Sequence, residues 1–143
     1  LIPNEFINFV NQKQMIVSGK LKRDNEGKLR KIISFVIRHG LGDIYAAYTP
    51  ENNLCAAVLF LRSNRRVNIL YSGITREGLD LNAMELLIDH FISYNSEKNL
   101  TLNFENLNIP GKENFFTGFG GINYHFITIR NYNNPFFNRL LST

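Results

Sequence analysis

The sequence is poor in the residues that carry covalent and metal chemistry. Its 143 residues include one cysteine, three histidines and no tryptophan. A single cysteine excludes a disulfide within the chain and a thiolate metal cluster, and it fits a reducing compartment. Because Cys55 lies inside an apolar run, we interpret it as a packing residue rather than a nucleophile. The histidines His39, His90 and His125 lack the spacing of a metal site, so no metal is expected.

Long apolar segments are also missing. The longest apolar run, Leu54 to Leu61, has eight residues. A membrane-spanning helix needs about 20. The first residues of the chain have neither the basic start nor the apolar centre of a secretory signal peptide. We therefore expect a cytoplasmic protein with no membrane partner.

The sequence does contain enough apolar material for one buried core. Apolar residues make up 44% of the chain, with 12 Phe and 6 Tyr among the aromatics. A chain of this length buries roughly two-thirds of its unfolded surface, so one domain over residues 1–143 is expected. The net charge of +4 permits binding to phosphate, a nucleotide or nucleic acid without choosing among them.

The first part of the chain has two helical patterns. Residues 3 to 13 are predicted to form a short amphipathic helix, and residues 14 to 23 show no clear period and are interpreted as a connector. Asp24 is predicted to cap a second helix that stops at Gly40. The core face of this second helix is predicted to contain Leu29, Ile32, Ile33, Val36 and Ile37.

Three strand-like runs follow, at Asp43–Thr49, Leu54–Leu61 and Arg66–Ser72. Turn residues separate them, which predicts an antiparallel meander. The middle run is apolar on both faces, as expected of a central strand that helices cover on both sides.

The remaining pattern is that of a helix followed by a parallel strand. A helix is predicted from Leu81 to Tyr94 and a strand at Leu100–Phe104, with a right-handed crossover that makes the flanking strands parallel. The buried stripe of this helix is predicted to contain Leu81, Met84, Leu87, Ile88, Phe91 and Ile92. A short helix at 113–118, a strand at 123–131 and an apolar tail at 135–141 are predicted after it. The fold class is therefore α/β (α+β), with a mixed, mainly antiparallel sheet flanked by helices.

Two segments near the end carry a family resemblance. Asn103–Asn106 and Phe115–Gly121 resemble the strand, loop and short helix that close GNAT acyltransferase domains. They are particularly similar to the Fem-like branch, which pairs two GNAT domains and includes aminoacyltransferases of bacterial cell-wall synthesis. The resemblance covers roughly residues 24 to 131. It implies a GNAT-like sheet without the first strand and first helix of a full domain, and a chain that is the C-terminal part of a longer tandem protein.

The resemblance also implies a donor site for acetyl-CoA or another acyl-CoA. In the family the donor lies between two splayed parallel strands, and here the strand 66–72 would present its backbone to the pantetheine arm. The pyrophosphate would be held by amides of the loop that opens the long helix. The loop here matches the family's Arg-x-x-Gly-x-Gly/Ala signature only in part, and Asp80 is interpreted as a helix cap, so a plain strand-to-helix connection is an equal alternative to cofactor binding. The residues implied to bind the donor are Tyr71, Ser72, Gly73, Ile74, Arg76, Gly78, Leu79, Leu81, Asn82 and Ala83.

Acyl transfer to an amine needs a base, a polarised carbonyl and often an acid for the leaving thiolate. The resemblance implies a tyrosine acid on the short helix, but Phe116 occupies that position and has no proton to donate. Tyr124, Tyr71 and His125 are the nearby substitutes in the sequence, but none lies at the family's motif position, and the alternative for each is a core or rim residue. Tyr124 and Asn106 are taken as the candidate catalytic residues.

Three functions stay open at this point. The first is an acyltransferase that acylates a small-molecule or peptide amine, with direct attack by an amine deprotonated through water. The second is half of a Fem-like enzyme that uses aminoacyl-tRNA, which basic residues such as Arg62, Arg65 and Arg66 favour. The third is a degenerate, non-catalytic domain that forms a homodimer or contacts a second GNAT domain, with aromatic residues of 132–137 at the interface.

Overall fold

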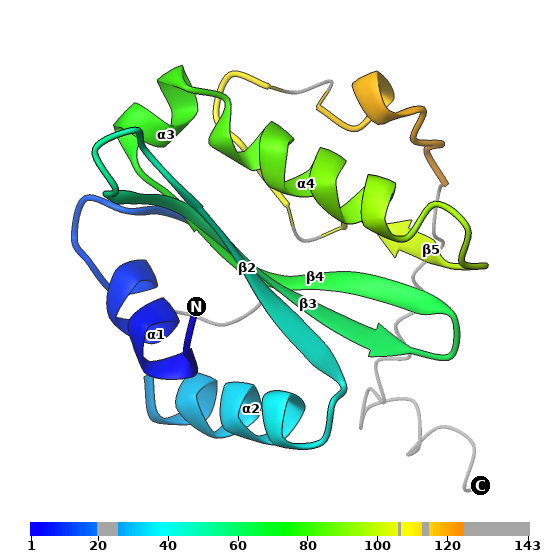
Figure 1. The fold of residues 1–143 in the computed structure, drawn as a ribbon, viewed down its shortest axis with the longest axis horizontal. Helices are drawn as coiled ribbons and strands as arrows, with labels where there is room; N and C mark the ends of the chain where they lie inside the picture. The colour runs from blue at the N-terminus through cyan, green and yellow to red at the C-terminus, as the bar shows by residue number, and fades with distance from the viewer. Residues whose placement is uncertain (20–25, 106, 113–114, 125–143) are drawn as a thin grey trace, which may run out of the picture.

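The chain folds into three layers. The computed structural model describes residues 1–19, 26–105, 107–112 and 115–124. In these residues a five-stranded sheet lies between helices α1 and α2 on one face and α3 and α4 on the other (Figure 1). The predicted class, a mixed and mainly antiparallel sheet flanked by helices, is confirmed. Within the described part of the chain, every helix is too short or too polar for a membrane crossing.

The two predicted helices on the first face are present, although the first ends at Val10 and not at residue 13. Helix α1 (Pro3–Val10) starts with proline, which has no N–H to leave unpaired in the first turn. Helix α2 (Glu26–Arg38) stops just before Gly40, which has a φ of 63°. Glycine adopts this left-handed conformation without strain. The predicted cap, Asp24, lies outside the described residues. Both helices bury their apolar stripes against the sheet through Phe6, Ile7, Phe9, Val10, Leu29, Ile33 and Val36.

The predicted meander is present. Strands β2 (Gly42–Tyr48), β3 (Leu54–Ser63) and β4 (Arg66–Ile74) pair antiparallel in sequence order. The turn between β3 and β4 places Asn64 and Arg65 at φ values of 46° and 60°, the left-handed pair that suits the twist of a hairpin. The middle strand is buried on both faces from residue 55 to 60, as its composition predicts.

The interpretation of residues 14–23 as a connector is wrong for four of them. Residues Ile16–Gly19 form strand β1, which pairs antiparallel with the second half of β4, so that Ile16 lies opposite Ile74 and Gly19 opposite Tyr71. The strand is too short to show a period of its own. Its conformation depends on the edge of β4, which the local sequence does not reveal.

The single predicted helix over residues 81–94 is also corrected. A short helix α3 (Arg76–Asp80) precedes α4 (Ala83–Tyr94), and Asn82 joins them with a left-handed φ of 53°. Asp80 therefore ends α3 instead of capping the long helix. Leu81, predicted to be buried, is 51% exposed in this junction. The other predicted stripe residues of α4 are buried or half-buried.

The final described segments close the sheet and the core. Strand β5 (Thr101–Asn103) pairs parallel with β4, as the crossover predicts. Of the helix predicted over residues 113–118, the described residues contain a 3-10 turn, η2 (Thr117–Phe119). Beyond residue 124, the predicted strand and the apolar tail lie outside the described residues.

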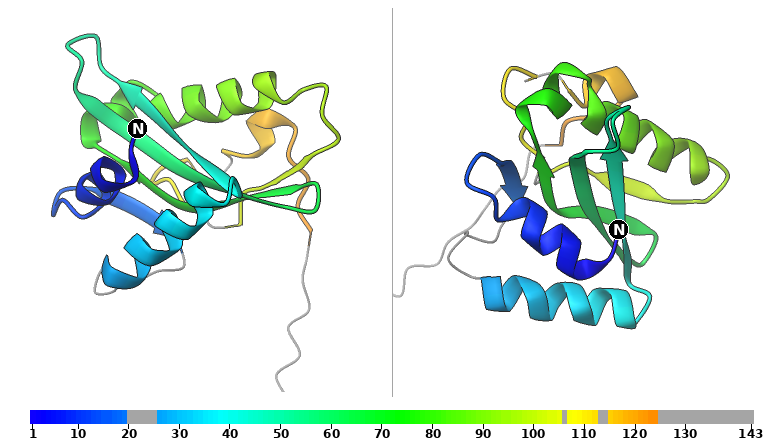
Figure 2. Two further views of the ribbon diagram at one scale, coloured as in Figure 1. Left: turned by 60° about the horizontal axis from the view of Figure 1, so that its bottom comes forward. Right: turned by 60° about the vertical axis from the view of Figure 1, so that its left-hand side comes forward.

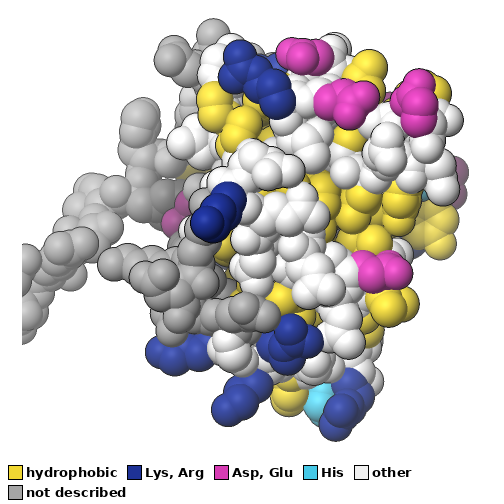
Figure 3. Space-filling model, turned by 90° about the vertical axis from the view of Figure 1, so that its left-hand side faces the viewer, with side chains coloured by type: hydrophobic (Ala, Val, Ile, Leu, Met, Phe, Trp, Pro, Cys, Tyr) yellow, Lys and Arg dark blue, Asp and Glu magenta, His cyan; other side chains and the backbone are white. Residues whose placement is uncertain are grey.

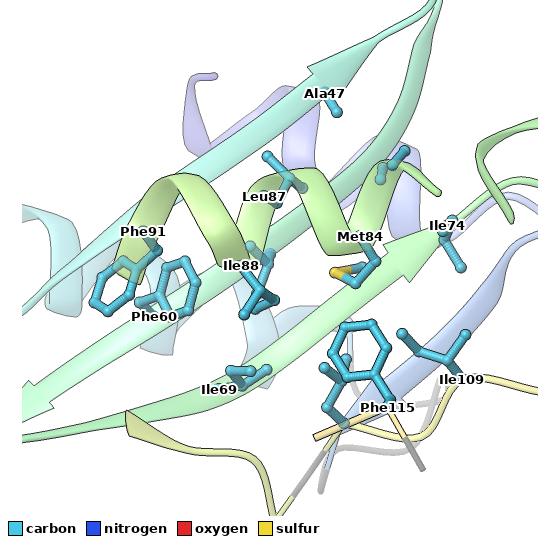
Figure 4. Packing of buried hydrophobic residues seen from close by; sticks show 14 of the residues in the cluster. Ala47, Phe60, Ile69, Ile74, Met84, Leu87, Ile88, Phe91, Ile109 and Phe115 are labelled. Carbon is cyan, nitrogen blue, oxygen red and sulfur yellow. The ribbon is translucent and has the colours of Figure 1, made fainter. Parts of the chain in front are cut away.

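The core on the α4 side is built around aromatic contacts. Phe60 of β3 and Phe91 of α4 stack with their ring centroids 4.1 Å apart (Figure 4). Ile109 and Phe115, from the segments after β5, close the same cluster beside Met84. Because this core depends on segments that follow β5, it fixes their position relative to β4.

Candidate functional site

The site implied by the family resemblance centres on the outer edge of β4. Strand β3 lies along one side of β4, and two strands share the other side. Strand β5 pairs with residues 66–68, and β1 pairs with residues 71–74. The edge expected to be open to a pantetheine arm is therefore paired with the chain's own β1. Tyr71, Ser72, Gly73 and Ile74 all lie in this pairing.

The loop implied to hold a pyrophosphate is instead a capped helical turn. The Thr75 Oγ1 atom accepts a hydrogen bond of 2.9 Å from the N–H of Gly78. The N–H groups of Leu79, Leu81 and Asn82 donate to main-chain carbonyl oxygens within residues 75–79. Four of the amides expected to face a phosphate thus already have partners in the chain.

Gly78 is needed here for packing. A Cβ atom at this position would overlap the carbonyl oxygen of Cys55 and come within 2.9 Å of Ile74 Cγ1. Glycine therefore lets α3 lie against the start of β3. This requirement holds whether or not a ligand binds the loop.

The start of α4 carries an ion pair. The Lys112 ammonium contacts the Glu85 carboxylate and donates a hydrogen bond of 2.7 Å to Asn82 Oδ1. The second carboxylate oxygen of Glu85, Oε2, is buried without a hydrogen-bond partner among the described residues. A phosphate at Asn82–Ala83 would have this carboxylate as a neighbour. The pair was not anticipated, because residues 85 and 112 are distant in sequence and come together only through the fold.

A shallow polar cleft lies beside β1. The Ser18 hydroxyl donates to the main-chain oxygen of Asn108 at 2.6 Å and accepts from its N–H at 3.1 Å. The adjoining cleft has a volume of about 410 Å³. It is lined by Ile16, Val17, Ser18, Gly19, Glu105, Asn108 and Pro110. The candidate catalytic residue Asn106 lies outside the described residues.

The aromatic residues considered as acids lie in different environments. Phe116 packs against Phe104 with a ring centroid distance of 5.7 Å, so an apolar contact stands where the family resemblance implies an acid. Tyr124 is 75% exposed, whereas Tyr71 is buried in the core on the α1–α2 side. The structure does not gather these tyrosines into one site, and His125 lies outside the described residues.

Two titratable groups within the sheet have shifted pKa values. Burial, with a smaller contribution from the Glu77 carboxylate, raises the pKa of the Cys55 thiol. This thiol also donates a weak hydrogen bond of 3.4 Å to the Ala47 carbonyl oxygen. Burial, and then the Asp43 carboxylate, raise the pKa of Tyr45. Both groups are therefore held in their neutral, protonated form.

The basic residues do not form one cluster. Arg62, at the hairpin, pairs with Asp43 at 2.5 Å and is not grouped with the exposed Arg65 and Arg66. A separate basic groove of about 280 Å³ lies on α2, lined by Arg30, Lys31, Ser34, Phe35, Arg38 and His39. Lys and Arg side chains gather along the lower margin of Figure 3, the side on which α2 lies. Such a surface attracts anions in general.

No protein-family model, curated protein or solved structure matches the chain. The likeness to GNAT domains therefore rests on the two motifs and on the order of the elements. Among the described residues, no three His, Cys, Asp or Glu side chains are grouped to hold a metal ion.

Proposed function

We propose that this chain is a GNAT-like domain with a binding role, which contacts a protein partner and does not use acyl-CoA. The observation that carries the proposal is the pairing of β1 with residues 71–74 of β4. A strand from the chain itself fills the edge at which the family resemblance implies an acyl donor. This is the degenerate, non-catalytic alternative of the three functions set out above.

The cost of opening that edge supports the proposal. A pantetheine arm would have to displace β1 and break its main-chain hydrogen bonds to β4. Each such hydrogen bond contributes about 0.5–1.5 kcal/mol net to stability. The donor would also have to compete with the hydrogen bonds that already satisfy the amides of Gly78, Leu79, Leu81 and Asn82.

One observation favours an acyltransferase as the second candidate. Strands β4 and β5 pair in parallel only over residues 66–68. Strand β1 has only four residues, none of them fully buried. If β1 moved out, the slot beside residues 71–74 would open next to Glu105 and Asn108, the residues that line the other wall of the polar cleft. In this candidate, an amine held beside Glu105 attacks the acyl carbonyl and loses a proton to water, and the thiolate of CoA leaves and takes a proton from water.

Thermal unfolding with and without saturating acetyl-CoA separates the two candidates. A ligand that binds only the folded chain at 100 times its Kd adds about 2.7 kcal/mol, which raises the midpoint by several degrees. We expect no rise. The matched variants are Ser18→Ala, which loosens β1, and Ser93→Ala on the exposed side of α4. A rise in the parent chain that Ser18→Ala enlarges and Ser93→Ala leaves unchanged would overturn the proposal in favour of the acyltransferase.

A further inference from the structure

Strand β2 lies at the end of the sheet, and no strand in the described part of the chain pairs with its outer edge. The strand order is β1-β4-β3-β2, and within the described residues β2 pairs with β3 alone (Figure 2). The outer edge of such a strand presents unpaired N–H and C=O groups, which proteins usually protect with lysine, proline or a bulge. Strand β2 reads Gly-Asp-Ile-Tyr-Ala-Ala-Tyr, with no lysine or proline, and its pairing with β3 is regular except for one shift between Ala47 and Tyr48. Its one charge, Asp43, is paired with Arg62 of β3.

The sequence of β2 is complementary to itself when a second copy runs antiparallel. With a two-fold axis at Tyr45, Gly42 lies opposite Tyr48 of the second copy, Asp43 opposite Ala47, and Ile44 opposite Ala46. Residues that face each other in this register have the same parity, so their side chains lie on the same side of the sheet. Small residues therefore face large ones at every position except the central pair of tyrosines. We propose that two copies of this chain associate through their β2 edges in this register.

The side chains on the edge suit this arrangement. Tyr48 is 50% exposed, so its ring is available to a second copy, whereas Gly42 opposite it is buried against Val36 and adds no bulk to the contact. The ring of Tyr45 already packs on Phe60 and Phe91, with centroid distances of 5.3 and 5.7 Å. The central pair would therefore join two aromatic clusters that exist in each copy.

Charge also permits the two-fold contact. Asp43 of one copy lies four residues along the strand from Asp43 of the other, a separation of about 13 Å. Each carboxylate keeps its own Arg62 partner at 2.5 Å. No pair of like charges is brought directly opposite, and the contact is isologous, so it closes as a dimer instead of growing into a fibre.

This inference gives the proposed binding role a partner, a second copy of the chain, and rests on that role. The two can fail separately. A thermal shift with acetyl-CoA would end the proposed function and leave the dimer contact standing. A monomeric chain would end the dimer contact without bearing on acetyl-CoA.

The first test is the mass of the purified chain by sedimentation over a hundredfold range of concentration. The monomer has a mass of 16.5 kDa, and we expect twice this mass at the upper concentrations. Tyr48→Lys places a charge on the exposed end of β2, and we expect it to remain a monomer throughout. The matched control Tyr124→Lys changes a tyrosine that is 75% exposed and far along the chain from β2, and it should dimerise like the parent.

Hydrogen exchange of the unmodified chain locates the contact without depending on a variant. We expect amides of residues 42–48 that face the outer edge to exchange at least tenfold more slowly at high concentration, with α4 amides unchanged. A monomer at all concentrations overturns the inference, as does a dimer that Tyr124→Lys breaks and Tyr48→Lys does not. Protection of the β2 amides at concentrations where the chain sediments as a monomer also overturns it, because the edge is then covered within one chain.

Discussion

Gly78 has a packing role in the structure that differs from the phosphate-binding role implied by the sequence. The motif resemblance assigns it to phosphate binding, but it lies where α3 touches the start of β3. We expect Gly78→Ala to lower the free energy of unfolding by about 1–3 kcal/mol, because its Cβ would overlap the Cys55 carbonyl oxygen and force the backbone to move. Urea unfolding measures this change.

Gly27→Ala is the matched control for this prediction. Gly27 lies in α2, and a Cβ there meets nothing within 4 Å. Alanine is favoured over glycine in a helix, so this variant should be more stable by up to about 1 kcal/mol. If both variants changed stability in the same direction by similar amounts, close packing at Gly78 would not be the cause.

For single residues, the sequence predicts which side of a helix is buried, but it does not predict contacts between distant segments. Helix faces could be predicted, because the burial of Met84, Leu87 and Ile88 follows from their spacing alone. The contact between Lys112 and Glu85 could not, since it joins the start of α4 to a segment beyond β5. The resemblance predicts free amides in the donor loop, because the sequence gives no sign of the short helix α3 or of the left-handed Asn82 that joins it to α4.

At the scale of elements, the stability of the pairing between β1 and β4 determines whether the implied donor slot stays closed. Ser18 fastens this strand through two hydrogen bonds to the backbone of Asn108. We expect Ser18→Ala to cost about 1 kcal/mol of local stability, which makes exchange of the β1 amides about fivefold faster. Hydrogen exchange resolved by residue measures this rate, and amides in the centre of β3 should keep theirs.

The comparison with Ser93→Ala makes this a test of one contact. Ser93 is exposed on α4, so its loss should leave β1 exchange unchanged. If the β1 amides exchanged at the same rate in Ser18→Ala and in the parent, the pairing with β4 alone would hold the strand in place. The slot would then be harder to open than the side-chain contact suggests.

Elements with a strong internal period were predicted, and those that depend on neighbours were not. The meander follows from runs of alternating or wholly apolar residues between turn residues, and the parallel β5 follows from the rule for crossovers. Strand β1 has four residues and depends on the half of β4 that β5 leaves unpaired. Because β4 pairs with β5 for only three residues, the sheet leaves room for this insertion, which no local pattern encodes.

For the molecule as a whole, the sheet lies between two apolar clusters, and Cys55 of β3 is 2% exposed between the layers. Burial raises the pKa of its thiol in the folded chain, so the native state holds this proton more tightly than the unfolded state. An unfolded thiol titrates near pH 8.5. Above this pH the unfolded state therefore binds fewer protons than the native state, and stability must fall as pH rises.

We expect the free energy of unfolding, measured in urea at a series of pH values, to be flat to about pH 8 and then to decline. One such group contributes a slope of up to about 1.4 kcal/mol per pH unit. Cys55→Ala removes the titrating thiol, so its curve should stay flatter until Tyr45, whose pKa is also raised by burial, adds its own decline above about pH 10. The slopes are compared instead of the absolute values, because the smaller alanine also changes packing. Equal slopes for the parent and Cys55→Ala between pH 8 and 10 would mean that the thiol is not held protonated by the fold, and that β3 opens far enough for solvent to reach it.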